Sequence, residues 1–439
     1  MRTTQHSPIA QLLSRRNTGR ERGIYSCCSA NEYVIRAVLR RAKSQDTVAL
    51  VEATANQVNQ NGGYTGMTPA DFRCFLERIA VDESFPVDRL LCGGDHLGPL
   101  TWQHLPEAEA MDNAEELVRA YVLAGFSKIH IDTSMRLADD DPTGHFPDTV
   151  IARRGARLCR AAEDAFLKYK ANHPNAPAPV YVIGSEVPIP GGARENEDSV
   201  AVTSPGDCEA TLSEFHHAFL NAGLGDAWDR VIALVVQPGV EFADESVIEY
   251  DQAAAKNLTA WLNSHPGLVF EGHSTDYQSR KHLREMVEDG IAILKVGPAM
   301  TFALREGLFA LEQIEQELYA VNDFPCSHFR DVLETVMLAD SGQWIKYYHG
   351  TTHQKRYARA FSYSDRARYY LTDEKVQDAV HTLLKNLDAV GVPMALLSQY
   401  MPIQWARVKS GELPLKAADL LIDRVGDCID DYLSAVISD

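Results

Sequence analysis

The sequence predicts an α/β protein whose main part is a (β/α)8 TIM barrel and whose C-terminal part is a helical extension. Eight short apolar runs alternate with segments of helical periodicity between residues 21 and 325. The runs are continuously apolar, as expected for parallel strands that are covered on both faces. Chemically active side chains stand where the runs end, which is where the loops of such a barrel build an active site. These three observations together predict the fold class.

Each strand is expected where an apolar run meets polar residues or glycine. The expected strands are 23–29, 47–54, 91–96, 128–132, 180–186, 230–237, 268–273 and 291–295. The expected helices are 31–41, one that begins after Thr68, and 114–124, 149–169, 209–222, 252–264 and 278–289. Thr68, Pro69 and Asp71 predict a helix start, because threonine caps helices, proline fits the first turn and an acid is favourable there. A doubly wound open sheet is the alternative, but eight nearly regular units favour the barrel.

The composition bounds the domain count and the classes of partner. A chain of 439 residues with 45% hydrophobic residues can form one large domain, or one domain with an appendage. A net charge of −19 disfavours nucleic-acid binding. The cysteines have no regular spacing, the N-terminus lacks an apolar signal segment, and no run reaches the roughly 18 apolar residues of a membrane span. We therefore expect reduced thiols, a cytoplasmic setting, and neither a nucleic-acid nor a membrane partner.

Three parts of the chain are distinguished by composition and periodicity. Residues 1–20 are polar and basic and are expected to form an N-terminal arm. Residues 21–325 carry the barrel pattern, and residues 326–439 are mostly helical and form the extension. In the extension, Ser364 is a candidate helix N-cap and Arg366 follows two residues later, a combination that can hold a substrate phosphate. The alternative is a capped surface helix.

Four expected strand ends carry a candidate metal site. The residues at these ends are His96, Asp132, Glu186 and His273. Only a barrel mouth would bring such separated residues together. Two imidazoles with carboxylate oxygens suit a divalent metal, which we expect to be Zn²⁺, with Mn²⁺, Co²⁺ or Fe²⁺ as alternatives. Such a metal can polarise a carbonyl and stabilise an enediolate. Asp95 is a candidate proton carrier and Glu186 a second catalytic candidate.

Other polar residues near the strand ends are candidate substrate ligands. Asn56 and Gln57 lie in a polar, glycine-rich loop after the second expected strand. Glu52 and Gln237 either bind sugar hydroxyls or make structural hydrogen bonds. Lys295 is either a charge partner or phosphate clamp, which we favour, or a Schiff-base lysine.

Three further histidines are expected to lie outside the site. His130 is expected to point away from the side that Asp132 faces, into the packing against the helices. His216 and His217 fall on an expected helix and are expected at the surface.

Long motifs extend over almost the whole chain and carry a family resemblance. They are VEATANQVNQNGGYTGMTPADF (51–72), GGDHLGP (93–99), AGFSKIHIDTSM (124–135), IGSEVPIPGG (183–192), VVQPGVEF (235–242), HSTDYQ (273–278), ILKVGPA (293–299) and FSYSDRARYY (361–370). Through these motifs the sequence resembles the Z subunit of bacterial tagatose-1,6-bisphosphate aldolase, a family often labelled tagatose-6-phosphate kinase. The kinase label has no support in the residues, because the sequence contains no Walker-type loop.

The resemblance implies functions for particular residues, because the family is similar to the metal-dependent class II aldolases. By position, Asp95 matches the proton-transfer aspartate, and His96 and His273 match metal ligands. Asp132 and Glu186 match carboxylates near the metal. The sequence departs from that pattern at the sixth strand, where Gln237 replaces a ligand histidine. It also departs after the seventh strand, where residues 274–277 replace a glycine-rich phosphate loop.

The resemblance also implies two functions. The first is a component of class II D-tagatose-1,6-bisphosphate aldolase in tagatose, galactitol or N-acetylgalactosamine catabolism, supporting a separate catalytic Y subunit. The second is a stand-alone metal-dependent 4-epimerase that interconverts tagatose 6-phosphate and fructose 6-phosphate, or the free ketohexoses, by retro-aldol and aldol steps. The expected partners are a ketohexose phosphate, a Y-type subunit in the first case, and further copies of the chain in an oligomer.

Overall fold

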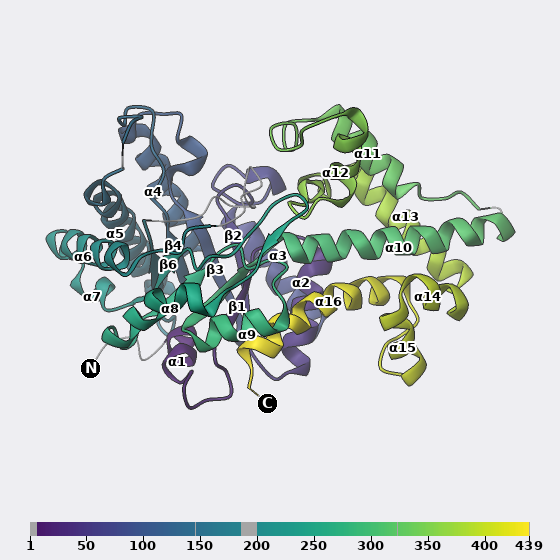
Figure 1. Ribbon diagram of the computed structural model, residues 1–439, viewed down its shortest axis with the longest axis horizontal. Coiled ribbons are helices and arrows are strands. Elements are labelled where there is room, and N and C mark those ends of the chain that lie inside the picture. Colours follow the sequence, from purple (N-terminus) through teal and green to yellow (C-terminus); the bar gives the residue numbers. More distant parts are fainter. Residues whose placement is uncertain (1–6, 145, 186–199, 323, 439) are drawn as a thin grey trace.

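The computed structural model describes residues 7–144, 146–185, 200–322 and 324–438, and its closed barrel confirms the predicted fold class (Figure 1). Eight parallel strands are hydrogen-bonded in the order β1-β10-β9-β6-β5-β4-β3-β2, which returns to β1. The strands are β1 (Ile24–Cys27), β2 (Ala49–Thr54), β3 (Leu90–Leu97), β4 (Lys128–Ile131), β5 (Val180–Ile183), β6 (Val231–Val236), β9 (Val269–Gly272) and β10 (Ile291–Val296). Each of them overlaps one expected range, so the strand predictions are confirmed.

Helices surround the barrel and follow its strands in sequence (Figure 1). They are α2 (Glu32–Ser44), α3 (Pro69–Asp82), α4 (Glu107–Leu123), α5 (Asp148–Asn172), α6 (Pro205–Asn221), α7 (Gly225–Trp228), α8 (Gln252–Trp261), α9 (Arg280–Glu288) and α10 (Pro298–Asn322). The start of α3 is as predicted, because Thr68 and Asp71 each accept a hydrogen bond from the other's backbone N–H and form a capping box. Helix α4 begins earlier than expected.

An apolar layer fills the N-terminal end of the barrel. Leu50, Leu91 and Val182 point inward and pack in one cluster with Ile9 and Leu13 of the short helix α1 (Pro8–Ser14). Helix α1 therefore covers this end of the barrel. Because side chains alternate along a strand, the next inward positions lie closer to the carboxyl ends, and they include polar residues such as Glu52, two residues after Leu50. The apolar base thus supports a polar site at the opposite end.

The helical extension continues beside the barrel and then returns to it (Figure 1). Its helices are α11 (Phe329–Ala339), α12 (Thr352–Phe361), α13 (Glu374–Val390), α14 (Met394–Tyr400), α15 (Pro402–Ser410) and α16 (Ala417–Val436). Helix α16 packs against α2, α9 and α10, and the Tyr432 hydroxyl donates a hydrogen bond to the Thr275 carbonyl oxygen, 2.8 Å away. The division at residues 325 and 326 stays a prediction, and α16 makes the extension continuous with the barrel.

A short hairpin after β6 was not predicted. It consists of β7 (Glu241–Phe242) and β8 (Val247–Ile248), which pair antiparallel. Two-residue strands are too short to leave a periodic pattern in the sequence. Among the described residues, no helix is both long and apolar enough to cross a bilayer.

Candidate active site

The inward positions of β4 supply the floor and one wall of the site. Lys128, His130 and Asp132 are spaced two residues apart, and residues with this spacing point to the same side of a strand. His130 is fully buried and its Nδ1 lies 3.0 Å from Asp95 Oδ1. The expectation that His130 points outward is therefore wrong, because it treated positions two residues apart as lying on opposite faces.

A bulge in β3 turns two adjacent side chains into the barrel mouth. Gly94 pairs with Ile129 and Leu97 pairs with Ile131, so β3 holds one more residue than β4 over this interval. His96 lies in this interval with a φ of 47°, a left-handed conformation that is rare for a residue with a side chain. As a result, His96 Nε2 lies 3.9 Å from Asp95 Oδ1, and both side chains face the site.

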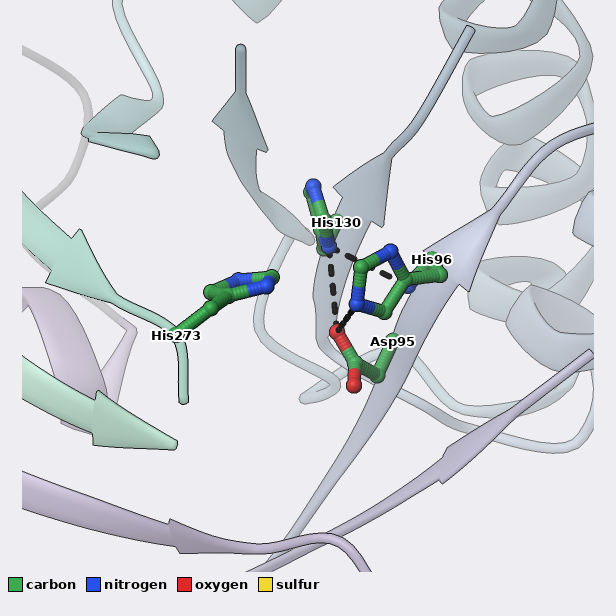
Figure 2. Close-up of side chains that lie close together, drawn as sticks. All are labelled: Asp95, His96, His130 and His273. Carbon is green, nitrogen blue, oxygen red and sulfur yellow. Dashed lines mark hydrogen bonds and ion pairs between the residues drawn. The ribbon is translucent and has the colours of Figure 1, made fainter. Parts of the chain in front are cut away.

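Three imidazoles and one carboxylate meet at the mouth of the barrel. Figure 2 shows His96, His130 and His273 arranged around the carboxylate of Asp95. The ring centroids are 4.8 to 5.2 Å apart, and one ligand atom from each of the four residues lies within 4.8 Å of the others. The cluster is close to the spacing of about 4.2 Å that two ligands of a single Zn²⁺ can span.

The donor set fits a divalent metal. Burial lowers the pKa of His273 to about 4, so its imidazole is neutral near pH 7, as a ligand must be. His130 faces the cluster with Nδ1, which lies 3.0 Å from Asp95 Oδ1 and accepts a hydrogen bond from the His96 backbone N–H at 3.1 Å (Figure 2). His96 Nδ1 lies 2.8 Å from Asp132 Oδ2, so this carboxylate contacts the imidazole on the nitrogen other than the one near Asp95. The residues that could hold a metal are therefore the three histidines, with Asp95 beside them.

Asp95 is ionised in this environment. Burial alone would raise the pKa of its carboxyl, but the nearby His96 and Lys295 hold that pKa well below its usual range. Lys295 Nζ lies 2.9 Å from Asp95 Oδ1 and also forms an ion pair with Glu52. Burial would lower the pKa of Lys295, but Asp95 and the other nearby anionic groups raise it well above its usual value. A protonated amine is not a nucleophile, so the charge-partner interpretation of Lys295 fits better than a Schiff base.

A layer of paired charges lies directly below the histidines. Lys128 Nζ is 2.7 Å from Glu52 Oε1 and 2.7 Å from Glu271 Oε2, and all three side chains are fully buried. Glu271 also contacts His273 Nε2 at 3.0 Å, and Glu52 contacts Lys295. Gly93 makes room for this layer, because a Cβ there would stand 2.4 Å from the Glu52 carboxylate. The two lysines and two glutamates balance in charge and connect the layer to the site above.

A pocket of about 110 Å³ opens above the cluster. Its lining includes Asn56, Gln57, Asp95, His96, His273 and Lys295, which are predicted site residues. It also includes Cys28, Tyr64, Phe242 and Asp276, as well as Arg368 and Tyr369 from the short helix η6 (Arg366–Tyr370) of the extension. The extension therefore contributes part of the wall. A cavity that combines polar groups with aromatic walls is typical of a small-molecule site.

Two predicted substrate ligands have structural contacts instead of facing the pocket. Glu52 lies in the charged layer, bound to Lys128 and Lys295. The Gln237 side chain accepts hydrogen bonds from the backbone N–H groups of Gly239 (2.9 Å) and Val240 (3.0 Å) and so closes a turn. For both residues the structural alternative fits the observed contacts.

Glu186 lies outside the described residues. The expectation that Ser364 caps a helix is wrong, because Asp365 holds the cap position of η6 and the Ser364 hydroxyl donates to Asp244 at 2.9 Å. The Arg366 guanidinium stacks 3.3 Å from the centre of the Tyr347 ring, whereas Arg368 lines the pocket.

Several residues of the site were not predicted from the sequence. Lys128 and His130 left a usable signal, since their spacing with Asp132 follows the two-residue period of a strand. Glu271 left the same signal two residues before His273. Arg368 left none, because the pattern of the sequence does not reveal which arginine of the extension turns toward the barrel.

The fold and the site together define a (β/α)8-barrel protein with a polar pocket and a candidate metal cluster at the carboxyl ends of its strands. The comparison with known families makes this class specific. Residues 9–437 match the family described as "D-tagatose-1,6-bisphosphate aldolase subunit GatZ/KbaZ-like", and the chain belongs to that family.

Solved structures are similar to the chain to very different degrees. A protein of Sinorhizobium meliloti 1021, described as a "probable tagatose 6 phosphate kinase", is 46% identical, with a TM-score of 0.85 over 94% of this chain and 100% of that one. Fructuronate-tagaturonate epimerase UxaE from Cohnella laeviribosi is 10% identical, with a TM-score of 0.44 over 96% of this chain and 82% of that one. Fructose-bisphosphate aldolase from Campylobacter jejuni is 13% identical, with a TM-score of 0.39 over 89% of this chain and 97% of that one. The last two are too distant to carry an argument about function.

Proposed function

We propose that this chain has its own active site and supports metal-dependent retro-aldol and aldol chemistry on a ketohexose phosphate. The observation that carries the proposal is the convergence of three imidazoles and the Asp95 carboxylate in the barrel mouth, where Asp95, His96 and His273 line one pocket. A subunit that only bound a partner would have no need for such a cluster. The family description, which names an aldolase subunit, agrees with this class of reaction.

The proposed metal ligands are His96, His130 and His273. A divalent ion, with Zn²⁺ expected and Mn²⁺, Co²⁺ or Fe²⁺ as alternatives, would polarise the ketose carbonyl and stabilise the charge of an enediolate. His130 comes from the fourth strand and supplies the third imidazole that the sixth strand lacks, where Gln237 stands instead. Asp132 then acts through His96 by holding its ring. The predicted ligand Glu186 stays a prediction.

Asp95 is the proposed base. In a retro-aldol step it would take the proton of the C4 hydroxyl, the C3–C4 bond would break, and its electron pair would move toward the carbonyl at C2. Asp95 is ionised, faces the pocket and lies next to His96, so it can accept a proton at that place. Lys295 lies 2.9 Å from Asp95 and holds its carboxylate in position. Return of the proton accompanies the reverse, bond-forming step.

Arg368 is the proposed partner of the substrate phosphate. Its guanidinium lines the pocket and, among the described residues, it has no carboxylate within ion-pair distance. Its hydrogen bonds go instead to the carbonyl oxygens of Ser364 and Asp365, the latter at 3.0 Å, and to the hydroxyl of Tyr369 (3.0 Å). These contacts fix the guanidinium plane and leave its charge for an anion.

Two roles are compatible with this chemistry. As an aldolase component, the chain would act with a catalytic Y-type subunit on tagatose 1,6-bisphosphate. As a 4-epimerase, it would cleave the C3–C4 bond, let the aldehyde rotate and rebuild the bond with the opposite configuration at C4. The second role is favoured by the presence of base, candidate metal ligands and phosphate partner in one chain.

The experiment incubates the purified chain with fructose 6-phosphate after metal removal by a chelator and reloading with one of the four metals. Sugar analysis should find tagatose 6-phosphate only with metal, and Asp95→Asn should keep its metal but lose the conversion. Exposed Asp88, at the opposite end of β3, provides the control variant Asp88→Asn. A parallel reaction adds a catalytic aldolase subunit and tagatose 1,6-bisphosphate and measures triose phosphates. No effect of the metal-loaded chain in either reaction would disprove the proposal.

A further inference from the structure

The N-terminus of helix α10 holds an anion that belongs to the chain itself. Asp276 Oδ1 accepts hydrogen bonds from the backbone N–H groups of Gly297 (3.1 Å) and Ala299 (2.8 Å), at the first turn of this 25-residue helix. The Asp276 side chain is 3% exposed and lines the pocket beside Gly297 and Pro298. A buried carboxylate therefore occupies the N–H groups that begin the helix after the last barrel strand.

Those N–H groups are the natural place for a phosphate on a barrel of this kind. Loops after the last two strands and a helix N-terminus commonly form the phosphate site of a (β/α)8 barrel, because free N–H groups and the helix dipole favour an anion. The Asp276 carboxylate already accepts from two of these groups. A phosphate could bind these N–H groups only by displacing the carboxylate. A phosphate next to the Asp276 carboxylate would be repelled by its negative charge.

The cations of the pocket lead to the same conclusion. Besides the two histidines, two lining residues are basic, and one of them, Lys295, is already paired with Glu52 and Asp95. Arg368 is the remaining basic side chain in the described lining, and it has no carboxylate within ion-pair distance. The described part of the pocket thus offers one unpaired guanidinium for one ligand phosphate.

From these observations we infer that the pocket accepts a ketose with a single phosphate, bound at Arg368, and that Asp276 excludes a second phosphate from the α10 N-terminus. The inference rests on the proposed function for the kind of ligand. It makes Asp276 a specificity-determining residue. In this arrangement a ketose bisphosphate would be the substrate of the partner subunit rather than of this pocket.

The test compares the binding of fructose 6-phosphate and fructose 1,6-bisphosphate to wild type, Asp276→Ala and Asp276→Asn by calorimetry. We expect wild type to bind the bisphosphate no more than about threefold more tightly than the monophosphate. Asp276→Ala frees the two N–H groups and should shift this ratio toward the bisphosphate by about tenfold or more, the free energy of one added charged contact. Asp88→Ala is the matched control and should leave the ratio unchanged.

Two results would overturn the inference. One is a wild-type protein that binds the bisphosphate about tenfold more tightly than the monophosphate. The other is a folded Asp276→Ala variant with an unchanged ratio. If Asp276→Ala does not fold, Asp276→Asn decides, because it removes the charge and keeps an acceptor oxygen. It should shift the ratio in the same direction by less, and an unchanged ratio again overturns the inference.

Inorganic phosphate separates this inference from the proposed function, because its binding needs no turnover. In an Arg368→Ala background the proposed phosphate partner is absent, and phosphate binding should be lost. Adding Asp276→Ala to this background should restore binding at the α10 N-terminus. Phosphate that still binds Arg368→Ala alone would show that Asp276 does not block the helix. Failure of the proposed function would instead appear as absent turnover with this binding pattern intact.

Discussion

Asp132 Oδ2 lies 2.8 Å from Nδ1 of His96, while Nε2 of the same ring lies 3.9 Å from Asp95 Oδ1. Asp132 also accepts hydrogen bonds from the backbone N–H of Ser134 (3.1 Å) and its hydroxyl (2.7 Å), which fix the carboxylate. Burial would raise the pKa of Asp132, but its hydrogen bond with His96 and the nearby imidazoles of His96 and His130 lower that pKa to about 2. An ionised, fixed carboxylate keeps the proton of His96 on Nδ1 and turns Nε2 toward the cluster.

The first prediction concerns the substitution Asp132→Asn. The amide of Asn lacks the negative charge that orients the His96 ring. A hydrogen bond that orients a metal ligand in this way is worth about 10- to 100-fold in metal affinity. We expect Zn²⁺ affinity, measured by competition with a chromophoric chelator, to fall by that factor while the fold is retained. Asp88→Asn serves as the control and should bind like wild type. An unchanged affinity would mean that Asp132 does not orient His96.

The second prediction distinguishes His130 from the other histidines. If His130 supplies the third imidazole, His130→Ala should lose metal as completely as His96→Ala and His273→Ala. The matched control is His217→Ala, which removes an exposed imidazole on α6. Metal content after desalting, measured by atomic emission, should be near zero for the three site variants and normal for the control. A His130→Ala protein that keeps one metal per chain would show that His130 is not a ligand. It would favour the ligands predicted from the sequence, which are His96, Asp132, Glu186 and His273.

The third prediction compares the two arginines of the extension. Arg368 lines the pocket and Arg366 stacks on Tyr347, so Arg368→Ala should weaken fructose 6-phosphate binding by about 10- to 100-fold, the value of a charged hydrogen bond. Free fructose should lose less than about threefold, since it lacks the phosphate. Arg366→Ala is the matched variant and should affect both sugars equally. A selective loss of the phosphosugar in Arg366→Ala would favour the partner predicted from the sequence.

The fourth prediction tests the charged layer. Lys128→Met would leave the buried carboxylates of Glu52 and Glu271 without their shared cation, and removing one partner of a buried pair costs about 3–5 kcal/mol. Urea unfolding should report this loss, and adding Glu271→Gln should recover part of it. Lys281→Met, at a side chain that is 75% exposed, should change the free energy of unfolding by no more than about 0.5 kcal/mol. A loss for Lys128→Met as small as that of the control would contradict the pairing.

The fold was predictable because each apolar run, taken alone, has the length and the continuous apolar character of a buried parallel strand. The strands β2 and β6 could be predicted without reference to the rest of the chain, because the sequence of each is typical of a buried parallel strand. The site was predictable only where a residue ends a run, as His96 and His273 do. The hairpin β7–β8 could not be predicted, because it depends on tertiary contacts rather than on a local pattern.

Orientation was harder to predict than position. His130 lies where the sequence placed it, yet its predicted direction was wrong, because residues two apart on a strand were assigned to opposite faces. Asp95 and His96 both face the site only because of a bulge in β3, and no pattern in the sequence predicts this bulge. Arg368 and Asp276 act across long separations in sequence, from the extension and from the loop after β9. Such contacts form only when the chain has folded, so the sequence pattern does not reveal them.

The last prediction concerns stability and pH at Asp276. Burial raises the pKa of its carboxyl to about 6, and hydrogen bonds from Ala299 and Gly297 offset only part of that effect. An unfolded aspartate has a pKa of about 3.9, so between about pH 4 and pH 6 the folded state binds more protons than the unfolded state. The contribution of Asp276 to stability is therefore fullest below that window and is lost as pH rises through it.

The substitution Asp276→Asn removes this titration. The free energy of unfolding of the variant minus that of wild type should rise between about pH 4 and pH 6 and level off above, by at most about 3 kcal/mol for a shift of about two pKa units. Urea unfolding of both proteins across this range measures the difference, and Asp88→Asn should show no such rise. A flat difference would mean that the Asp276 carboxylate is as well stabilised in the fold as in water, by the N–H groups of α10 and by Arg368.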